Sequence, residues 1–241
     1  MPTDLVTVGA LFPRDTPWSA AGVVAIPIRT RLVRPGDDVT DLVAQAVAGI
    51  ARPDDVVVIA ETAVAIAQGR AIAAETIRPS RLAYVLSRRA GALATVNQPE
   101  SLQLVIDEVG APRVLYAACM HVLGRLRGRR GVFYEILGET IATIDGYTGT
   151  LPPFERTIVL GPQHPDRVAQ LIAERIGAHA VVVDANDLGI AKVLGASRGV
   201  RRAAVEEALV HNPQGNGDEQ TPVVLLKRRG TGAHPFLEGA A

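Results

Sequence analysis

The segment Asp55-Val-Val-Val-Ile-Ala60 decides how this sequence folds. It holds a short apolar run that is rich in β-branched residues and carries no polar position between its ends. Such a run is too short and too β-branched for a helix and is typical of a strand that is buried on both faces. The sequence therefore predicts a sheet with a central strand here, and the flanking segments must supply the layers that cover it.

Toward the N-terminus, Val23-Val-Ala-Ile-Pro-Ile28 predicts a second strand, in which Pro27 favours an edge position because proline cannot donate to a sheet ladder. Apolar residues recur at helical spacing over residues 39–50, which predicts a helix. Asp37 and Asp38 precede it, and their carboxylates can accept hydrogen bonds from the free N–H groups of a first turn. A strand, a helix and a buried strand thus follow one another.

Toward the C-terminus, Ser80 and Pro99 each open a helical pattern, so residues 80–126 predict a helical cluster. Beyond it, residues 132–137 and 139–144 are alternating runs separated by a glycine, and they predict a pair of antiparallel strands.

The last hundred residues read as a strand at 156–160, a helix closed by Gly177 and a strand at 180–183, which predicts a βαβ unit. A helix over 200–210 and a strand over 222–227 follow, and the Gly-rich tail predicts a loose end. The predicted fold class is α+β, with mixed α/β sheets and packed helices.

The composition excludes several classes of protein. The 25 basic and 25 acidic residues cancel, so no overall field attracts nucleic acid or an anionic membrane, and 48% hydrophobic residues suffice for a core. One cysteine, Cys119, excludes an internal disulfide or a Cys-rich zinc site. The sequence shows neither an apolar run of membrane-spanning length nor a secretory signal pattern, so we expect a cytoplasmic protein.

Hard oxygen donors gather in three polar turns that follow predicted strands. Carboxylate and amide oxygens of this kind suit Mg²⁺ or Mn²⁺, which can in turn neutralise phosphate groups. Each turn taken singly is more often a self-capped turn than a metal site. The side chains are Asp145 with Thr148; Asp184 with Asn186 and Asp187; and Asn216 with Asp218 and Glu219.

Several familiar signatures are missing. The sequence contains no Walker A or G-x-G-x-x-G loop, no G-x-S-x-G elbow and no paired-histidine zinc motif. The arginines of residues 125–130 could clamp phosphates or bind RNA, although such a cluster is more often a solvated turn, and 4% aromatic residues offer few stacking platforms.

In order along the chain, these segments resemble a known family. They are Arg34-Pro-Gly-Asp-Asp38 before a helix, Asp55-Val-Val-Val-Ile-Ala-Glu61 continuing to Ala67-Gln-Gly-Arg70, the strand end at Asp184, and Gly215-Asn-Gly-Asp-Glu-Gln-Thr-Pro-Val-Val224. Together they resemble the γ-glutamyl ligases of the deazaflavin coenzyme F-420, and the closest likeness is to a divergent branch of that family. The resemblance covers roughly residues 23–229.

The resemblance implies a γ-glutamyl ligase-like α+β fold over residues 1–229, with a helical subdomain near 79–127 and a loose tail over 230–241. It implies a GTP-dependent ligase that joins a small-molecule carboxylate to an amino acid and acts as a homodimer. The lack of an apolar run of membrane-spanning length predicts no membrane partner. The resemblance assigns no catalytic side chain. The implied ligands of Mn²⁺ or Mg²⁺ are Asp145, Asp184 and Asn216, and the implied nucleotide contacts are Thr30, Arg31, Leu32, Val33, Glu61, Thr62, Thr148, Gln214, Gly215, Gly217, Asp218 and Glu219.

Three positions depart from the family pattern and leave an alternative open. Thr62 and Ile66 stand where the family pattern has lysines, and Glu61 stands where it has glutamine. A member of this fold without those lysines could bind a ligand and have lost the ligase activity.

Overall fold

The computed structural model describes residues 23–89, 95–129, 131–138, 144, 154, 156–186, 189–215, 219–228 and 234–238. The chain forms two compact units. The first combines residues 1–69 with 162–241, and the second is the segment 70–161 between them. The two parts of the first unit are thus separated in sequence by the whole second unit.

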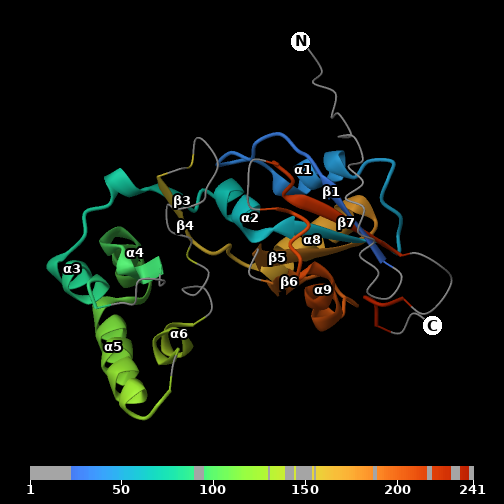
Figure 1. The fold of residues 1–241 in the computed structure, drawn as a ribbon. Helices are drawn as coiled ribbons and strands as arrows, with labels where there is room; N and C mark the ends of the chain where they lie inside the picture. The colour runs from blue at the N-terminus through green and yellow to red at the C-terminus, as the bar shows by residue number, and fades with distance from the viewer. Residues whose placement is uncertain are drawn as a thin grey trace. The chain divides into compact units, whose positions relative to one another are not determined.

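A five-stranded mixed sheet organises the first unit, in the order β1-β7-β2-β5-β6 (Figure 1). Its strands are β1 (Val23–Ile28), β2 (Val56–Ala60), β5 (His179–Asn186), β6 (Ile190–Ala196) and β7 (Val223–Arg228). The predicted buried strand is the central one: β2 runs parallel to β5 and antiparallel to β7, and Val56 to Ile59 are fully buried. β1 lies at one edge, as Pro27 predicts.

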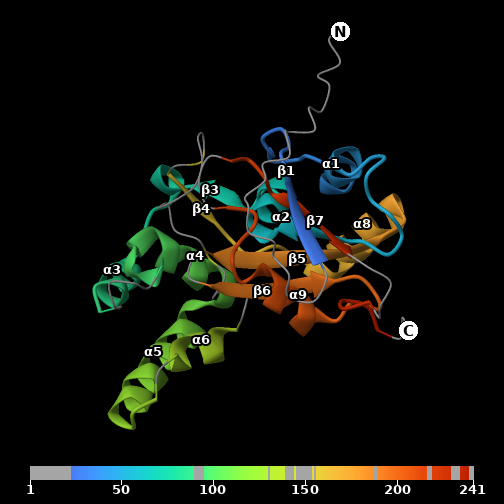
Figure 2. The same cartoon turned by 45° about the vertical axis from the view of Figure 1, so that its right-hand side comes forward.

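Helices cover both faces of this sheet (Figure 2). Helix α9 (Arg202–Leu209) packs on one face, where alternate strand residues such as Val58, Val181 and Val224 form a core cluster with it. Helices α1 (Val39–Ala46), α2 (Glu61–Ala67) and α8 (Pro165–Ile176) belong to the other face. Burial on both faces explains why β2 carries no polar residue.

Helix α8 approaches the sheet so closely that β6 must carry a glycine. A Cβ atom on Gly195 would lie 2.1 Å from the backbone carbon of Pro165, the first residue of α8. Since Gly195 is the register partner of Val182, this contact also fixes which face of β5 the helix covers.

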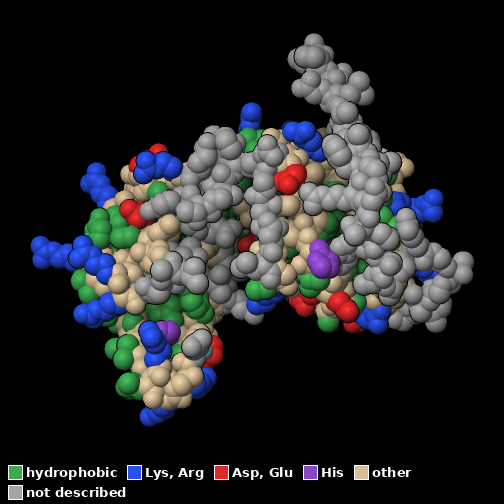
Figure 3. Space-filling view, viewed as in Figure 1, with side chains coloured by type: hydrophobic (Ala, Val, Ile, Leu, Met, Phe, Trp, Pro, Cys, Tyr) green, Lys and Arg blue, Asp and Glu red, His purple; other side chains and the backbone are tan. Residues whose placement is uncertain are grey.

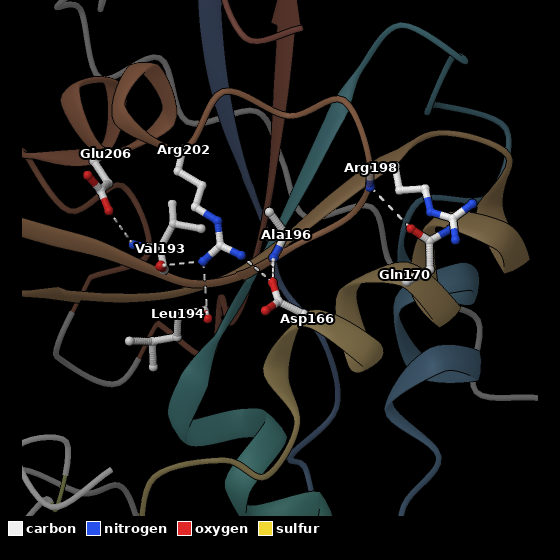
Figure 4. Close-up of polar contacts among 8 residues, drawn as sticks. All are labelled: Asp166, Gln170, Val193, Leu194, Ala196, Arg198, Arg202 and Glu206. Carbon is white, nitrogen blue, oxygen red and sulfur yellow. Dashed lines mark hydrogen bonds and ion pairs between the residues drawn. The ribbon is translucent and has the colours of Figure 1, made fainter. Parts of the chain in front are cut away.

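Side chains of α8 and α9 close the outer edge of β6 (Figure 4). The Val193 N–H donates to Glu206 Oε1 at 2.9 Å, and the Ala196 N–H donates to Asp166 Oδ1 at 2.9 Å. The Arg202 guanidinium donates to the Val193 and Leu194 carbonyl oxygens, each at 3.4 Å, and forms an ion pair with Asp166. These bonds occupy backbone groups that an edge strand would otherwise offer to another chain.

Residues 234–238 correct the expectation of a loose tail. Phe236 is 3% exposed within the sheet's core cluster, the Arg201 N–H donates to its carbonyl oxygen at 2.8 Å, and Leu237 forms a bridge with Val200. The glycines around this segment favoured a loose end, but the single large aromatic residue contributes enough apolar area to dock it.

The second unit contains four helices among its described residues: α3 (Arg81–Ser87), α4 (Pro99–Val109), α5 (Ala111–Leu126) and α6 (Val132–Leu137). A two-stranded sheet of β3 (Ala71–Ala73) and β4 (Thr157–Val159) completes it, with two short 3₁₀ turns at Ala74–Thr76 and Thr95–Asn97. Leu102, Val105, Val114 and Ile158 lie at the centre of its core. That the two units act as one domain over residues 1–229 stays a prediction.

The structure corrects two predicted elements. Residues 132–137 form helix α6 and not a strand: Gly131 begins it at a φ of 81°, and Val132 packs against Gly124 of α5. Most of the partner strand predicted at 139–144 lies outside the described residues. The predicted βαβ unit is also wrong, because β4 pairs with β3 in the small sheet, whereas β5 pairs with β2 and β6.

The fold class is the predicted one. A mixed sheet with helices on both faces, beside a helical cluster with its own small sheet, is an α+β architecture.

Candidate functional site

The polar segments of the first unit lie at one end of the strands of the five-stranded sheet, which we call the sheet edge. β1, β2 and β5 all end there, and β6 and β7 begin there, because β6 and β7 run antiparallel to the other three. Ligands of open α/β sheets bind outside the carboxyl ends of parallel strands, so this edge is the first place to look for a site.

Asp184 and Lys192 form the charged pair of this edge. They are register partners in the antiparallel β5–β6 ladder, so their side chains project from the same face of the sheet. Burial of the Asp184 carboxylate raises its pKa above that of an ordinary aspartate, and the positive charge of Lys192 acts in the opposite direction. A carboxylate that is partly withdrawn from water gains from any cation that approaches it.

β5 extends through Asn186, so Asp184 and Asn186 belong to the strand and not to a turn after it. The Ile190 N–H donates to Asn186 Oδ1 at 3.3 Å. Asn186 therefore fixes the beginning of β6. Asp187 lies outside the described residues.

Glu61 and Thr62 follow β2 directly and open helix α2. Ala60 is the register partner of Val183, so Glu61 comes to the edge at the level of Asp184. Glu61 is only 5% exposed, and Thr62 is half-buried. Ile66 lies further along helix α2 and is also buried, so this position contributes to the apolar packing of the unit.

The segment after β1 is held by its neighbours at the edge. The Thr30 N–H donates to the Gln220 carbonyl oxygen at 3.0 Å, which joins this segment to the loop before β7. Arg31 Nη1 lies 2.6 Å from Asp37 Oδ2, and this ion pair lowers the pKa of Asp37. Leu32 is half-buried and Val33 is buried.

Gln214 ties the loop before β7 to the sheet. Its Nε2 donates to the Pro222 carbonyl oxygen at 3.0 Å, and the same oxygen accepts from the Ala60 N–H at 2.8 Å. The Thr221 hydroxyl donates to the Gln214 carbonyl oxygen at 2.5 Å. Gln220 has a φ of 54°, a left-handed conformation that is uncommon outside glycine and asparagine. The loop thus has a fixed shape at both of its described ends.

The structure therefore brings together many of the residues singled out in the sequence. Those at or beside this edge are Thr30, Arg31, Leu32, Val33, Glu61, Thr62, Asp184, Gln214, Gly215 and Glu219. Asp145, Thr148, Asn216, Gly217 and Asp218 lie outside the described residues. Among the residues that are described, no group of three or more His, Cys, Asp or Glu side chains is placed to hold a metal ion.

Lys192 is the residue that the sequence did not reveal. It is one of only two lysines in the chain, the other being Lys227. Two apolar runs on either side of an Asn-Asp-Leu-Gly turn are typical of a β-hairpin, and this signal would have paired Lys192 with Asp184.

These features define an α+β protein with a polar, partly buried sheet edge that is suited to a small charged ligand. Residues 27–187 match the family described as F420-0:Gamma-glutamyl ligase, and the chain belongs to that family. The match extends from β1 through β5, so it includes the whole second unit.

A curated relative extends the likeness along the chain. It is the coenzyme F420:L-glutamate ligase of Methanopyrus kandleri, which is 26% identical over 240 residues. The alignment covers 86% of this chain and 86% of the relative. Family and relative together support a γ-glutamyl ligase activity on small-molecule substrates. Within the described parts of the chain, no helix is long and apolar enough to span a membrane.

Proposed function

We propose that this chain is a metal-dependent, nucleotide-using γ-glutamyl ligase that joins the carboxylate of a deazaflavin coenzyme precursor to the amino group of glutamate. The observation that carries the proposal is the convergence of the segments after β1, β2 and β5 and the loop before β7 at one sheet edge. The family membership and the name of the Methanopyrus kandleri relative supply the substrate class.

The chemistry of Asp184 fits a divalent cation. Its carboxylate offers hard oxygen atoms, and its raised pKa reflects a desolvation cost that a bound Mg²⁺ or Mn²⁺ would offset. Asp145 and Asn216 are the other ligands that we propose. A bound ion would supply neutralisation of the phosphate charge.

The residues of the edge have distinct roles in this proposal. Lys192 supplies a positive charge for nucleotide phosphates, in place of the family lysines at positions 62 and 66. The segment from Thr30 to Val33 and the loop from Gln214 to Glu219, which the hydrogen bond from the Thr30 N–H to the Gln220 carbonyl oxygen joins, bind the nucleotide in this proposal, together with Thr148.

The reaction that we propose has two steps. A carboxylate oxygen of the acceptor attacks the terminal phosphorus of GTP, and the bond to the nucleoside diphosphate breaks. The glutamate nitrogen then attacks the acyl carbon, phosphate leaves, and the nitrogen loses a proton. Such chemistry depends on positioning and charge neutralisation more than on a protein nucleophile.

A non-catalytic binding protein of the same fold is the second candidate. The observation that favours it is the pair Thr62 and Ile66, because these uncharged side chains stand where the family pattern has two lysines that would meet phosphate. This candidate predicts nucleotide binding without turnover across a panel of carboxylates and amines.

Isothermal titration of the full chain with GTP and Mn²⁺ tests the proposal, with Asp184→Asn as the matched variant. We expect binding that depends on the metal and is lost in the variant. Metal-independent binding, or no binding at all, would overturn it.

The homodimer implied by the resemblance is part of the proposal. Sedimentation equilibrium of the full chain is expected to give twice the mass of one chain, and a single-chain mass at all concentrations would remove this part.

A further inference from the structure

The chain passes between its two units twice. It leaves the first unit after Gly69, beyond the end of helix α2, and returns to it at Pro162, before helix α8. The first passage contains the segment Ala67-Gln-Gly-Arg70. The hydrogen bonds made within these two passages decide whether the units are joined by loose linkers or by a defined joint.

Gln68 and Gln163 close the two passages on the side of the first unit. Gln68 Nε2 donates to the Gln163 carbonyl oxygen at 2.9 Å, and the Gln163 N–H donates to Gln68 Oε1 at 2.7 Å. One side-chain amide thus makes the two hydrogen bonds that a facing main-chain residue makes in a β-ladder. It does so beside Pro162, which has no N–H to donate to a ladder.

Arg70 closes the passages on the side of the second unit. Its carbonyl oxygen accepts from the Leu160 N–H at 3.0 Å, and its Nε donates to the Gly161 carbonyl oxygen at 2.6 Å. Beyond it, β3 and β4 continue as an antiparallel pair, with Ala71 opposite Val159. The two passages therefore form one two-stranded ribbon and not two independent linkers.

Two glycines lie between the bonds of Gln68 and those of Arg70. Gly69 lies in one strand of the ribbon at a φ of 73°, and Gly161 lies in the other, directly before Pro162. A Cβ atom on Gly69 would meet no atom within 4 Å beyond its chain neighbours, so this glycine serves the left-handed backbone and not close packing. Hinges are built from a few residues of this kind at the ends of elements.

We propose that this double passage is a hinge on which the second unit swings as one body, and that Gln68 is the residue that clamps it. Two connections that lie side by side permit rotation about the line through both, whereas a single linker permits rotation in every direction. The dihedral angles of Gly69 and Gly161 absorb that rotation, because glycine accepts the widest range of backbone conformations. Gln68 holds the two passages together and so prevents the ribbon from twisting and splaying.

Helix α2 anchors the clamp in the first unit. The helix begins at Glu61, directly after β2, and Gln68 is the residue that follows its last turn. The side chains from Ala63 to Ala67 are buried, and the Gly36 N–H donates to the Ala67 carbonyl oxygen at 2.9 Å. The helix is therefore fixed to the sheet, and the swing begins beyond the clamp.

A distance measurement between two spin labels tests the proposal. Both units carry charged side chains on their surface (Figure 3), and labels can replace two of them without disturbing either core. The labelled protein carries Cys119→Ser with Arg88→Cys at the end of α3 and Glu207→Cys on α9, which are exposed positions in different units. Dilution with an excess of unlabelled chain restricts the signal to distances within one chain.

Gln68→Ala removes both hydrogen bonds of the clamp. The loss of two ordinary hydrogen bonds raises the unclamped population about fivefold to a hundredfold, so we expect the distance distribution to become at least about twice as wide. The matched control is Gln163→Ala, because Gln163 bonds to Gln68 through its main-chain N–H and carbonyl oxygen. This control should leave the distribution of the labelled protein unchanged.

Gln68→Glu keeps the size of the side chain but places an oxygen opposite the Gln163 carbonyl oxygen. It should widen the distribution as Gln68→Ala does, and neither change disturbs the core because Gln68 is exposed. Equal widths for Gln68→Ala and the labelled protein without it would overturn the proposal, and so would an equal widening by Gln163→Ala.

Discussion

Asp184 and Lys192 face each other across the antiparallel ladder of β5 and β6, at the sheet edge where three strands end. This pairing places one of the chain's two lysines beside the carboxylate that we propose as a metal ligand. A protein that lacks lysine at positions 62 and 66 of helix α2 thus has a cation at the same edge, supplied by strand β6.

Lys192→Met should therefore weaken nucleotide binding. Loss of one charge-assisted phosphate contact costs about 1.5–3 kcal/mol, so we expect the dissociation constant for GTP with Mn²⁺ to rise roughly tenfold to a hundredfold in calorimetric titration. Lys192→Arg keeps the charge and should retain most of the affinity. Equal affinities of the Met variant and the unaltered chain would remove Lys192 from the site.

Arg202→Ala should open the outer edge of β6. The guanidinium bonds two carbonyl oxygens of the strand and pairs with Asp166, so its removal exposes backbone acceptors to other chains. Because this side chain is partly exposed, we expect a loss of only about 1 kcal/mol in the free energy of unfolding, with concentration-dependent association in sedimentation velocity as the main effect.

Arg198→Ala is the control for that experiment, because Gln170 accepts from the main-chain N–H of Arg198 and not from its side chain. It should sediment as the unaltered chain does. Association of both variants would show that surface charge, and not edge closure, governs the effect.

Acid should weaken the docking of the tail at His234. Burial lowers the pKa of this histidine, the neighbouring Asp54 opposes the shift, and the positive charge of Arg228 lowers the pKa further. Its pKa is thus lower in the folded chain than in the unfolded chain, which takes up the proton first as the pH falls. The free energy of unfolding should decrease as the pH falls below about 6.5.

Urea unfolding at several pH values between 5 and 8 measures this effect, with His234→Gln as the comparison. The variant should lose less stability than the unaltered chain over that range. Parallel pH profiles for the two proteins would assign the decrease to other groups.

Asp38→Ala should destabilise helix α1. The Asp38 carboxylate accepts from the Thr40 N–H at 2.8 Å and from the Asp41 N–H at 3.2 Å, as an N-cap does. We expect a loss of about 0.5–2 kcal/mol in the free energy of unfolding by urea. Asp41→Ala removes an exposed ion pair with Arg175 and a first-turn acid, but no capping hydrogen bond, and should cost less. A larger effect at Asp41 would contradict the assignment of the cap.

Local patterns in the sequence predict several elements of this fold correctly. The β-branched run after Asp55 becomes the central strand, Pro27 lies in an edge strand, and the helix after Asp38 begins where its cap predicts. That helix ends at Ala46, before the predicted residue 50. In each case the deciding interaction lies within a few residues of the pattern.

Contacts between neighbouring elements decide what the pattern of a single segment misses. The Val-Phe-Tyr run at 132–134 favours a strand by local propensity, yet Gly131 and the contact of Val132 with Gly124 produce a helix. The pairing of Lys192 with Asp184 depends on the hairpin of β5 and β6, which the periodicity of neither strand reveals and only the turn between them indicates. The sequence shows the acidic residues of the candidate site one by one, but it does not show that they lie at the same sheet edge.

The most direct test of the central claim is mass spectrometry of the product formed by the full chain. The reaction contains the deazaflavin precursor, glutamate, GTP and Mn²⁺, with Asp184→Asn in parallel. We predict a product heavier than the precursor by one glutamyl residue, formed only when GTP and metal are both present and absent with the variant. Unchanged precursor in the complete reaction, or the same product from Asp184→Asn, would contradict the assignment of a ligase site to this sheet edge.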